Sequence, residues 1–125
     1  MSQPTKIRVE VQTRFLREHS DPDSKRFAFS YEITIHNQTY QPVRLLSRHW
    51  IITDANGLEQ QVSGQGVVGE KPLIQPQRSF SYRSGTILRT PVGTMQGAYR
   101  MIGDDGVYFD ANIKPFRLAM PELVN

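Results

Sequence analysis

Three glycines with the spacing G-x-G-x-x-G, Gly64, Gly66 and Gly69, lie in the segment SGQGVVGEKP at residues 63–72. In dinucleotide-binding folds, such glycines join a parallel strand to a helix whose N-terminal amides bind the pyrophosphate. Here the prolines of the following EKPLIQPQ would break that helix. The residue about 20 positions after the motif, where those folds carry an acidic side chain for the ribose, is Arg89. We therefore interpret the segment as a glycine-rich connection between two strands.

Two roles remain open for these glycines. They can serve backbone geometry alone, by adopting positive φ or by letting another segment pass close to the chain. Alternatively, successive backbone amides of the loop form a nest for an anion. In this alternative the protein is a small-anion sensor that binds a pyrophosphate or nucleotide at the loop, with help from Arg48, Lys71 or Arg89.

Arg48 is a polar residue whose sequence context demands a partner. It lies in VRLLSRHWIITD, residues 43–54, where both odd and even positions are apolar. A guanidinium in such a strand must reach solvent or be held by a carboxylate, a set of carbonyls or an anion. We expect an internal ion pair with Asp54 or Glu59, with ligand recognition as the alternative. The neighbouring Trp50 is expected to lie in the core.

Residue types for a catalytic triad are present, but no pattern brings them together. His36, His49 and Ser47 occur with several aspartates, yet the sequence has no G-x-S-x-G nucleophile elbow. The 3 histidines form neither H-x-x-x-H nor H-E-x-x-H. We therefore predict no catalytic residue, no cofactor and no enzymatic activity.

A hard cation such as magnesium requires several converging oxygen ligands. The candidate cluster is Asp104, Asp105 and Asp110. The first two directly precede Gly106, an arrangement typical of a tight turn. We interpret them as turn residues, so that the sequence predicts no metal site.

The amino-acid composition indicates the cellular compartment in which the protein works. A chain of 125 residues corresponds to about one domain. The count of 0 cysteines excludes a disulfide framework, thiolate zinc and cysteine nucleophiles, and it suits a reducing cytoplasm. No apolar run has the length of a signal peptide or of a membrane span of about 20 residues. We therefore expect a cytoplasmic protein without a membrane partner.

The formal net charge of +3 is unevenly distributed. Residues 71–103 contain no Asp or Glu. Basic side chains in this window would attract phosphates or an acidic protein face if they converge; otherwise they are solvated separately on different strands. They are Lys71, Arg78, Arg83, Arg89 and Arg100.

The elements that must position these residues are strands. KIRVEVQTRF and RFAFSYEITIH alternate apolar and polar residues with a period of two, which predicts strands with one wet face. The segment 43–54 is apolar on both parities, as expected of a central strand or of one that changes face at a bulge. DANG at 54–57 and DDG at 104–106 predict hairpins. Further strands are expected in LEQQVS, RSFSYRS, TMQGAYRMI and VYFDANIKPFRL.

This pattern predicts an all-β chain, an antiparallel β-sandwich of about seven strands. We find no domain boundary and expect a single domain over residues 1–125. Residues 1–5 and 121–125 are expected to be flexible ends.

The segments LLSRHWIITDANG, VSGQGVVGEKP, GTMQGAYRM and DGVYFDANIKPFRL resemble the ApaG family, also called CorD, over nearly the whole chain. The resemblance implies an immunoglobulin-like or fibronectin type III-like sandwich, no established activity, and an association with cobalt and magnesium homeostasis and with diadenosine-tetraphosphate hydrolase genes. A similar domain in eukaryotic F-box and polymerase-interacting proteins implies protein binding. Two residues that depart from the family pattern, Arg78 and Lys114, both add positive charge.

We therefore expect a non-catalytic protein-interaction module that docks another protein through its sheet edges and loops, including residues 64–72. The small-anion sensor is the alternative. Nucleic acid is not an expected partner, because the alternation places Phe80 and Tyr82 inward and away from bases. Any link to cobalt or magnesium is expected to be indirect.

Overall fold

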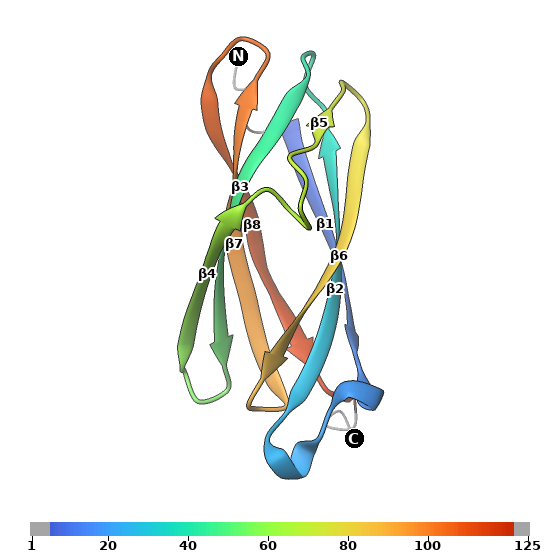
Figure 1. Cartoon of the computed structure of the whole chain (residues 1–125), viewed down its shortest axis with the longest axis vertical. Helices are drawn as coiled ribbons and strands as arrows, with labels where there is room; N and C mark the ends of the chain where they lie inside the picture. The colour runs from blue at the N-terminus through green and yellow to red at the C-terminus, as the bar shows by residue number, and fades with distance from the viewer. Residues whose placement is uncertain (1–5, 122–125) are drawn as a thin grey trace.

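The computed structural model describes residues 6–121, which form strands joined by turns and two short 3-10 turns (Figure 1). The all-β prediction is confirmed. The strands are β1 (Ile7–Phe15), β2 (Phe27–Asn37), β3 (Val43–Asp54), β4 (Glu59–Gln65), β5 (Leu73–Ile74), β6 (Ser79–Leu88), β7 (Val92–Gly103) and β8 (Tyr108–Ala119), with the 3-10 turns η2 (Arg17–His19) and η3 (Pro22–Ser24) between β1 and β2.

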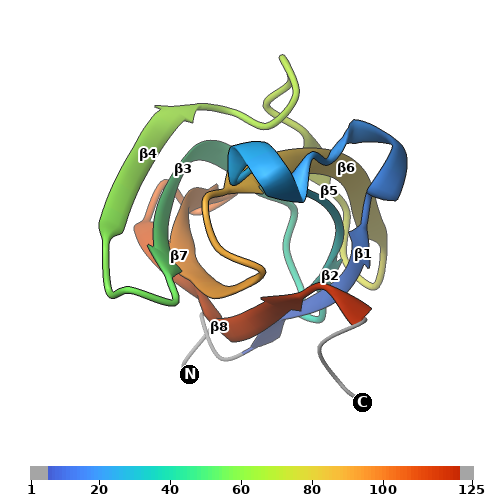
Figure 2. The same cartoon turned by 90° about the horizontal axis from the view of Figure 1, so that it is seen from below.

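Two antiparallel sheets form a sandwich, seen along its length in Figure 2. One sheet has the order β1-β2-β6; the other has the order β4-β3-β7-β8, with β5 paired to β3. On one side of the sandwich β1 contacts β8. On the other side, β4 and β6 are the outer strands of their sheets. We call this second side the open edge.

Alternation in β1 and β2 decides which side chains enter the core. Val11 pairs with Ile33, and Ile33 pairs with Tyr82 of β6, so that one face of this sheet is apolar. In β2, Phe29, Ile33 and Ile35 are almost completely buried between the sheets. From Ser30 to His36 the intervening residues of β2 are partly exposed and lie mostly beside polar residues of β1 and β6, whereas Ala28 is buried opposite Ile87. The predicted period-two strands are therefore confirmed.

The strand with apolar residues on both parities contains a bulge. The pairing of β3 with β7 shifts register between Leu45 and Ser47. Before the bulge, odd positions such as Leu45 are buried; after it, the even positions Trp50 and Ile52 are buried. A bulge inserts one residue and so exchanges the two faces. Trp50 packs edge-on against Tyr31 and Tyr99, which confirms its place in the core.

Both predicted hairpin turns are present, with Gly57 at φ +82 and Gly106 at φ +81. The Asp54 carboxylate accepts hydrogen bonds from the amides of Asn56 and Leu58 and so holds the first turn. Of the expected flexible ends, residues 1–5 and 122–125 lie outside the described residues.

Candidate functional site

The glycine-rich segment folds into a tight turn between β4 and β5, which we call the glycine hairpin (residues 66–70). Val67 and Glu70 exchange two backbone hydrogen bonds, of 2.8 and 2.9 Å. Between them, Val68 has φ +47 and Gly69 has φ +81. Positive φ at both central residues is the geometry of a type I′ turn. The segment leads into the short strand β5, in place of the helix that a dinucleotide fold requires.

Each glycine of the motif meets a different structural requirement. A β carbon at Gly64 would lie 2.7 to 2.8 Å from the Arg48 guanidinium. At Gly66, φ is +62 and a β carbon would lie 2.2 Å from the Glu70 carbonyl oxygen. Gly69 has open space around it but needs positive φ. Positive φ explains Gly66 and Gly69, a close backbone approach adds to the need for glycine at position 66, and Gly64 leaves room for the end of the Arg48 side chain.

Arg48 is held by backbone carbonyls at the base of the glycine hairpin. Its Nη1 donates to the carbonyl oxygens of Gln65 at 3.2 Å and Gly66 at 2.9 Å. The expected ion pair of Arg48 with Asp54 or Glu59 is wrong, because the pairing of β3 with β4 places Arg48 opposite Gly64. Glu59 lies about 16 Å further along β4, at about 3.3 Å per residue. The guanidinium thus fixes the point where β4 ends and the turn begins.

The amides of the glycine hairpin are largely used within the protein. The amide of Gly66 donates to the carbonyl of Leu46, and those of Val67 and Glu70 donate to each other's carbonyls. An anion nest needs successive amides that point together at the ligand. Three amides of this turn already donate hydrogen bonds to carbonyls of the protein and are not available to an anion, which disfavours a polyphosphate site.

The remaining predicted residues divide between two places. The side chain of Lys71 lies beside Gly66, and the carbonyl of Lys71 accepts a hydrogen bond from Arg44. Arg89 follows β6 and lines a hollow with Leu58, at the start of β4. The glycine hairpin follows the opposite end of β4, about 20 Å away at about 3.3 Å per residue. The structure therefore brings Arg48 and Lys71 to the hairpin but not Arg89.

The glycine hairpin presents a strained apolar residue at its tip. Val68 is 65% exposed and is a β-branched residue at positive φ. Such a backbone conformation is an outlier for valine and is retained where the surroundings impose it, often at binding sites. Figure 2 shows the segment between β4 and β5, in yellow-green, standing out from the sandwich on the side of the open edge.

Below the hairpin, the open edge is hollowed and partly apolar. Leu58 is 66% exposed and Ile87 is 45% exposed. Gln60 and Ile87 each line two neighbouring hollows, which therefore adjoin. The first is lined by Ile52, Asp54, Leu58, Gln60, Ile87, Leu88 and Arg89, and the second by Leu16, His19, Arg26, Ala28, Phe29, Gln60, Gly85, Thr86 and Ile87.

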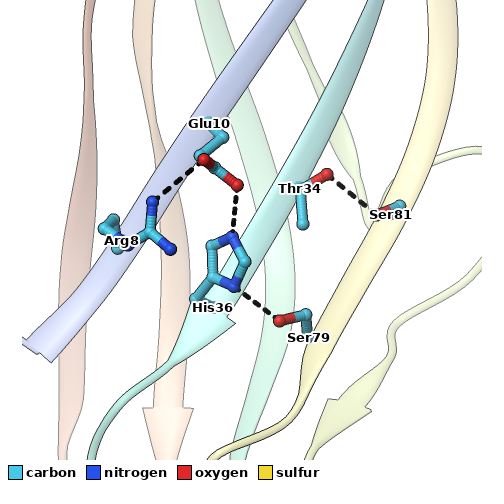
Figure 3. Close-up of polar contacts among 6 residues, drawn as sticks. All are labelled: Arg8, Glu10, Thr34, His36, Ser79 and Ser81. Carbon is cyan, nitrogen blue, oxygen red and sulfur yellow. Dashed lines mark hydrogen bonds and ion pairs between the residues drawn. The ribbon is translucent and has the colours of Figure 1, made fainter.

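A polar cluster that sequence reasoning missed lies on the outer face of the β1-β2-β6 sheet (Figure 3). His36 Nε2 lies 2.6 Å from a Glu10 oxygen, and its Nδ1 lies 2.6 Å from the Ser79 hydroxyl. Because a carboxylate only accepts, His36 Nε2 carries a proton and donates it to Glu10. Arg8 also contacts Glu10, at 3.0 Å. Hydrogen bonds from His36 and Arg8 hold the pKa of Glu10 below its usual value.

The order Ser79, His36, Glu10 is that of a hydrolase triad, but its setting differs. A nucleophilic serine works beside oxyanion donors in a hollow that binds substrate. All three residues here lie on extended strands, and the two hollows of the open edge are lined by others. Glu10 is about half exposed and shared with Arg8. We interpret the cluster as cross-strand hydrogen bonding on a wet sheet face.

Within residues 6–121, no group of three or more His, Asp or Glu side chains is placed to hold a metal ion. Asp105 accepts hydrogen bonds from the amide of Val107 and the side chain of Gln41, and so acts as a turn residue. Residues 6–121 contain no helix with the length and hydrophobicity of a membrane-spanning segment.

The inward aromatic residues of β6 and β7 share a buried polar contact. The hydroxyls of Tyr82 and Tyr99 are hydrogen-bonded to each other between the sheets. Burial raises the pKa of both phenols far above the ordinary value. Phe80 and Tyr82 therefore face the core, as the alternation predicted, and offer no exposed platform for stacking bases.

The described residues thus define a small antiparallel β-sandwich with a glycine hairpin at its open edge. The family model described as the ApaG domain matches residues 17–103. Protein ApaG of Pseudomonas syringae pv. tomato is 56% identical over 116 residues, which cover 93% of this chain and 92% of the relative. Protein ApaG of Pseudomonas fluorescens is 54% identical over 122 residues, or 97% of each chain. The chain belongs to the ApaG family.

Solved structures agree in fold. The crystal structure of an ApaA protein from Bordetella pertussis has a TM-score of 0.90 and 44% sequence identity, covering 92% of this chain and 94% of that one. An X-ray structure from a structural genomics consortium has a TM-score of 0.94 and 49% identity, covering 99% and 94%. The predicted immunoglobulin-like or fibronectin type III-like sandwich is confirmed.

Proposed function

We propose that this chain is a non-catalytic protein-interaction module of the bacterial cytoplasm, and that its docking surface is the open edge. The observation that carries the proposal is the pair of exposed apolar side chains, Leu58 and Ile87, beside adjoining hollows between the outer strands β4 and β6. Exposed apolar groups next to hollows supply the buried contacts on which most binding energy depends.

Strand geometry supports the same surface. An outer strand has a row of backbone amides and carbonyls without a partner strand, which an extended segment of another protein can pair with. Both β4 and β6 are outer strands on this side. The glycine hairpin stands beside them and exposes Val68. A docked segment would therefore meet backbone groups, apolar side chains and a projecting loop on one surface.

The small-anion sensor remains the alternative proposal and is less well supported. Arg48 is engaged by two carbonyls, and Arg89 lies at the other end of β4. A polyphosphate would need several positive groups and free amides at one point. The link to cobalt and magnesium that the family resemblance implies is proposed to be indirect, acting through the partner protein.

The test is capture of partners from an extract of the source cells with matched surface variants. Ile87→Glu and Leu58→Glu place a charge in the docking surface and are expected to abolish capture of the specific partner. Val107→Glu is the control, because Val107 is similarly exposed, at 58%, but lies in the β7–β8 turn. Equal capture by all three variants would contradict the proposal, provided that each variant keeps the thermal stability of the parent.

A further inference from the structure

The outer side of β6 has backbone groups that are available for pairing. β6 pairs with β2 over the register Phe27–Leu88 to His36–Ser79. Among residues 6–121, no backbone hydrogen bond joins β6 to any segment other than β2. Side chains at alternate positions of an added strand would therefore line up with alternate side chains of β6.

The outward positions of β6 have a definite order. Arg83 lies opposite Glu32, Gly85 opposite Ser30, and Ile87 opposite Ala28. Gly85 is exposed and has no side chain, which leaves a depression between Arg83 and Ile87; this position contributes to the second hollow of the open edge.

Close packing keeps Gly85 small. A β carbon there would lie 2.9 Å from the carbonyl oxygen of Phe29, so a larger residue would push against the backbone of β2. In sheets, a large apolar side chain on a neighbouring strand commonly covers such a glycine. The depression is therefore shaped for an apolar side chain of an added strand.

Positive charge flanks this apolar stretch. Arg83 has 70% of its side chain exposed and contacts Glu32 at 3.7 Å, a surface pair of little strength. Arg89 is exposed just beyond the end of β6. Glu32 contacts Arg83, and Asp54 lines the same hollow as Arg89, where its carboxylate accepts hydrogen bonds from the amides of Asn56 and Leu58. An acidic residue at each end of a docked strand would match the two arginines.

We propose that β6 binds an extended segment of a partner protein with the pattern acidic-x-apolar-x-apolar-x-acidic. Its alternate residues lie opposite Arg89, Ile87, Gly85 and Arg83, with the residue opposite Gly85 large and apolar. The order of charged and apolar positions is the same in both chain directions, and in antiparallel addition the large residue opposite Gly85 is the fifth of the seven. This inference rests on the proposed protein-interaction function and names the chemistry of the partner.

The test uses capped, fluorescein-labelled peptides measured by fluorescence anisotropy. The probe DTVTFTD has the proposed pattern, KTVTFTK reverses the end charges, and DTVPFTD contains a proline that breaks the strand. We expect the acidic peptide to bind at least about tenfold more tightly than the other two, with affinity that falls as salt rises.

Charge reversal in the protein makes the test specific. Arg83→Glu is expected to weaken binding of DTVTFTD and to strengthen binding of KTVTFTK, whereas Arg117→Glu on β8 of the other sheet leaves both affinities unchanged. Identical binding by the parent and Arg83→Glu would overturn the proposed pattern.

The two proposals fail in distinguishable ways. If DTVTFTD does not bind while Ile87→Glu still abolishes partner capture, the pattern on β6 is wrong and the interaction module stands. If DTVTFTD does not bind and the surface variants capture partners like the parent, both proposals are wrong.

Discussion

Gly66 lies against the backbone of Glu70, so closely that a β carbon at position 66 would come within 2.2 Å of the Glu70 carbonyl oxygen. Gly69, three residues on, shares the positive φ but has open space around its α carbon. Substitution of Gly69 therefore measures the free-energy cost of a left-handed backbone alone. Substitution of Gly66 measures that cost together with the cost of the close approach.

We expect Gly69→Ala to lower the free energy of unfolding by roughly 1 kcal/mol, the cost of positive φ for a residue with a β carbon. Gly66→Ala is expected to cost clearly more, because the Glu70 carbonyl must also move. Urea denaturation of both variants measures the difference. Equal losses at the two positions would show that the close approach does not matter.

Titration with pyrophosphate, ATP or NAD is expected to give no saturable heat. The amides of Gly66, Val67 and Glu70 already donate within the protein, and Arg48 is held by carbonyls. Isothermal calorimetry at low salt is the measurement, since low salt favours anion binding. Saturable micromolar binding that Gly66→Ala abolishes in a folded protein would favour the small-anion sensor.

The buried hydroxyls of Tyr82 and Tyr99 are expected to act as a unit. Either Tyr82→Phe or Tyr99→Phe leaves one buried hydroxyl without its partner and should cost about 1 to 3 kcal/mol of unfolding free energy. The double variant should cost less than the sum of the two single changes, because it leaves no unpaired hydroxyl from this pair. Additive losses in a double-mutant cycle would mean that the hydrogen bond contributes nothing.

Glu10 makes a pH-dependent contribution to stability. Its folded-state pKa is lowered from 4.5 by hydrogen bonds to His36 and Arg8. A carboxylate with a depressed pKa stabilises the fold above the unfolded-state pKa, and this stability is lost as the pH falls through the folded-state value. The difference in melting temperature between the parent and Glu10→Gln should thus be constant above about pH 4.5 and shrink at lower pH. A constant difference throughout would rule out this linkage.

The period of two in the sequence was sufficient to predict the sandwich, because alternation directly encodes which face of β1 and β2 is buried. The mixed parity of β3 correctly indicated a bulge or a buried central strand, and the register shift after Leu45 is the bulge. β5 was missed because two residues, Leu73 and Ile74, are too few to show a period.

The site was harder to predict because it depends on register. The sequence indicated that Arg48 needs a partner, but only the pairing of Arg48 with Gly64 shows that the partners are the carbonyls at the end of β4. Arg89 was grouped with the glycines by charge, although β6 carries it to the other end of the open edge.

The same dependence on register hid the polar cluster on the outer sheet face. Glu10 and Ser79 are 26 and 43 residues from His36 in the chain, and no sequence motif joins them. The alternation of polar residues in β1 and β2 was the available signal, since it placed His36 and Glu10 on the same wet face.

The most direct test of the interaction module is photo-crosslinking in the source cells from single positions of the chain. A benzophenone amino acid in place of Ile87 lies on the open edge, and one in place of Val107 lies in the β7–β8 turn as a matched exposed control. We predict a discrete covalent adduct with another protein from position 87 and none from position 107. Adducts from neither position, or equally from both, would contradict docking at the open edge.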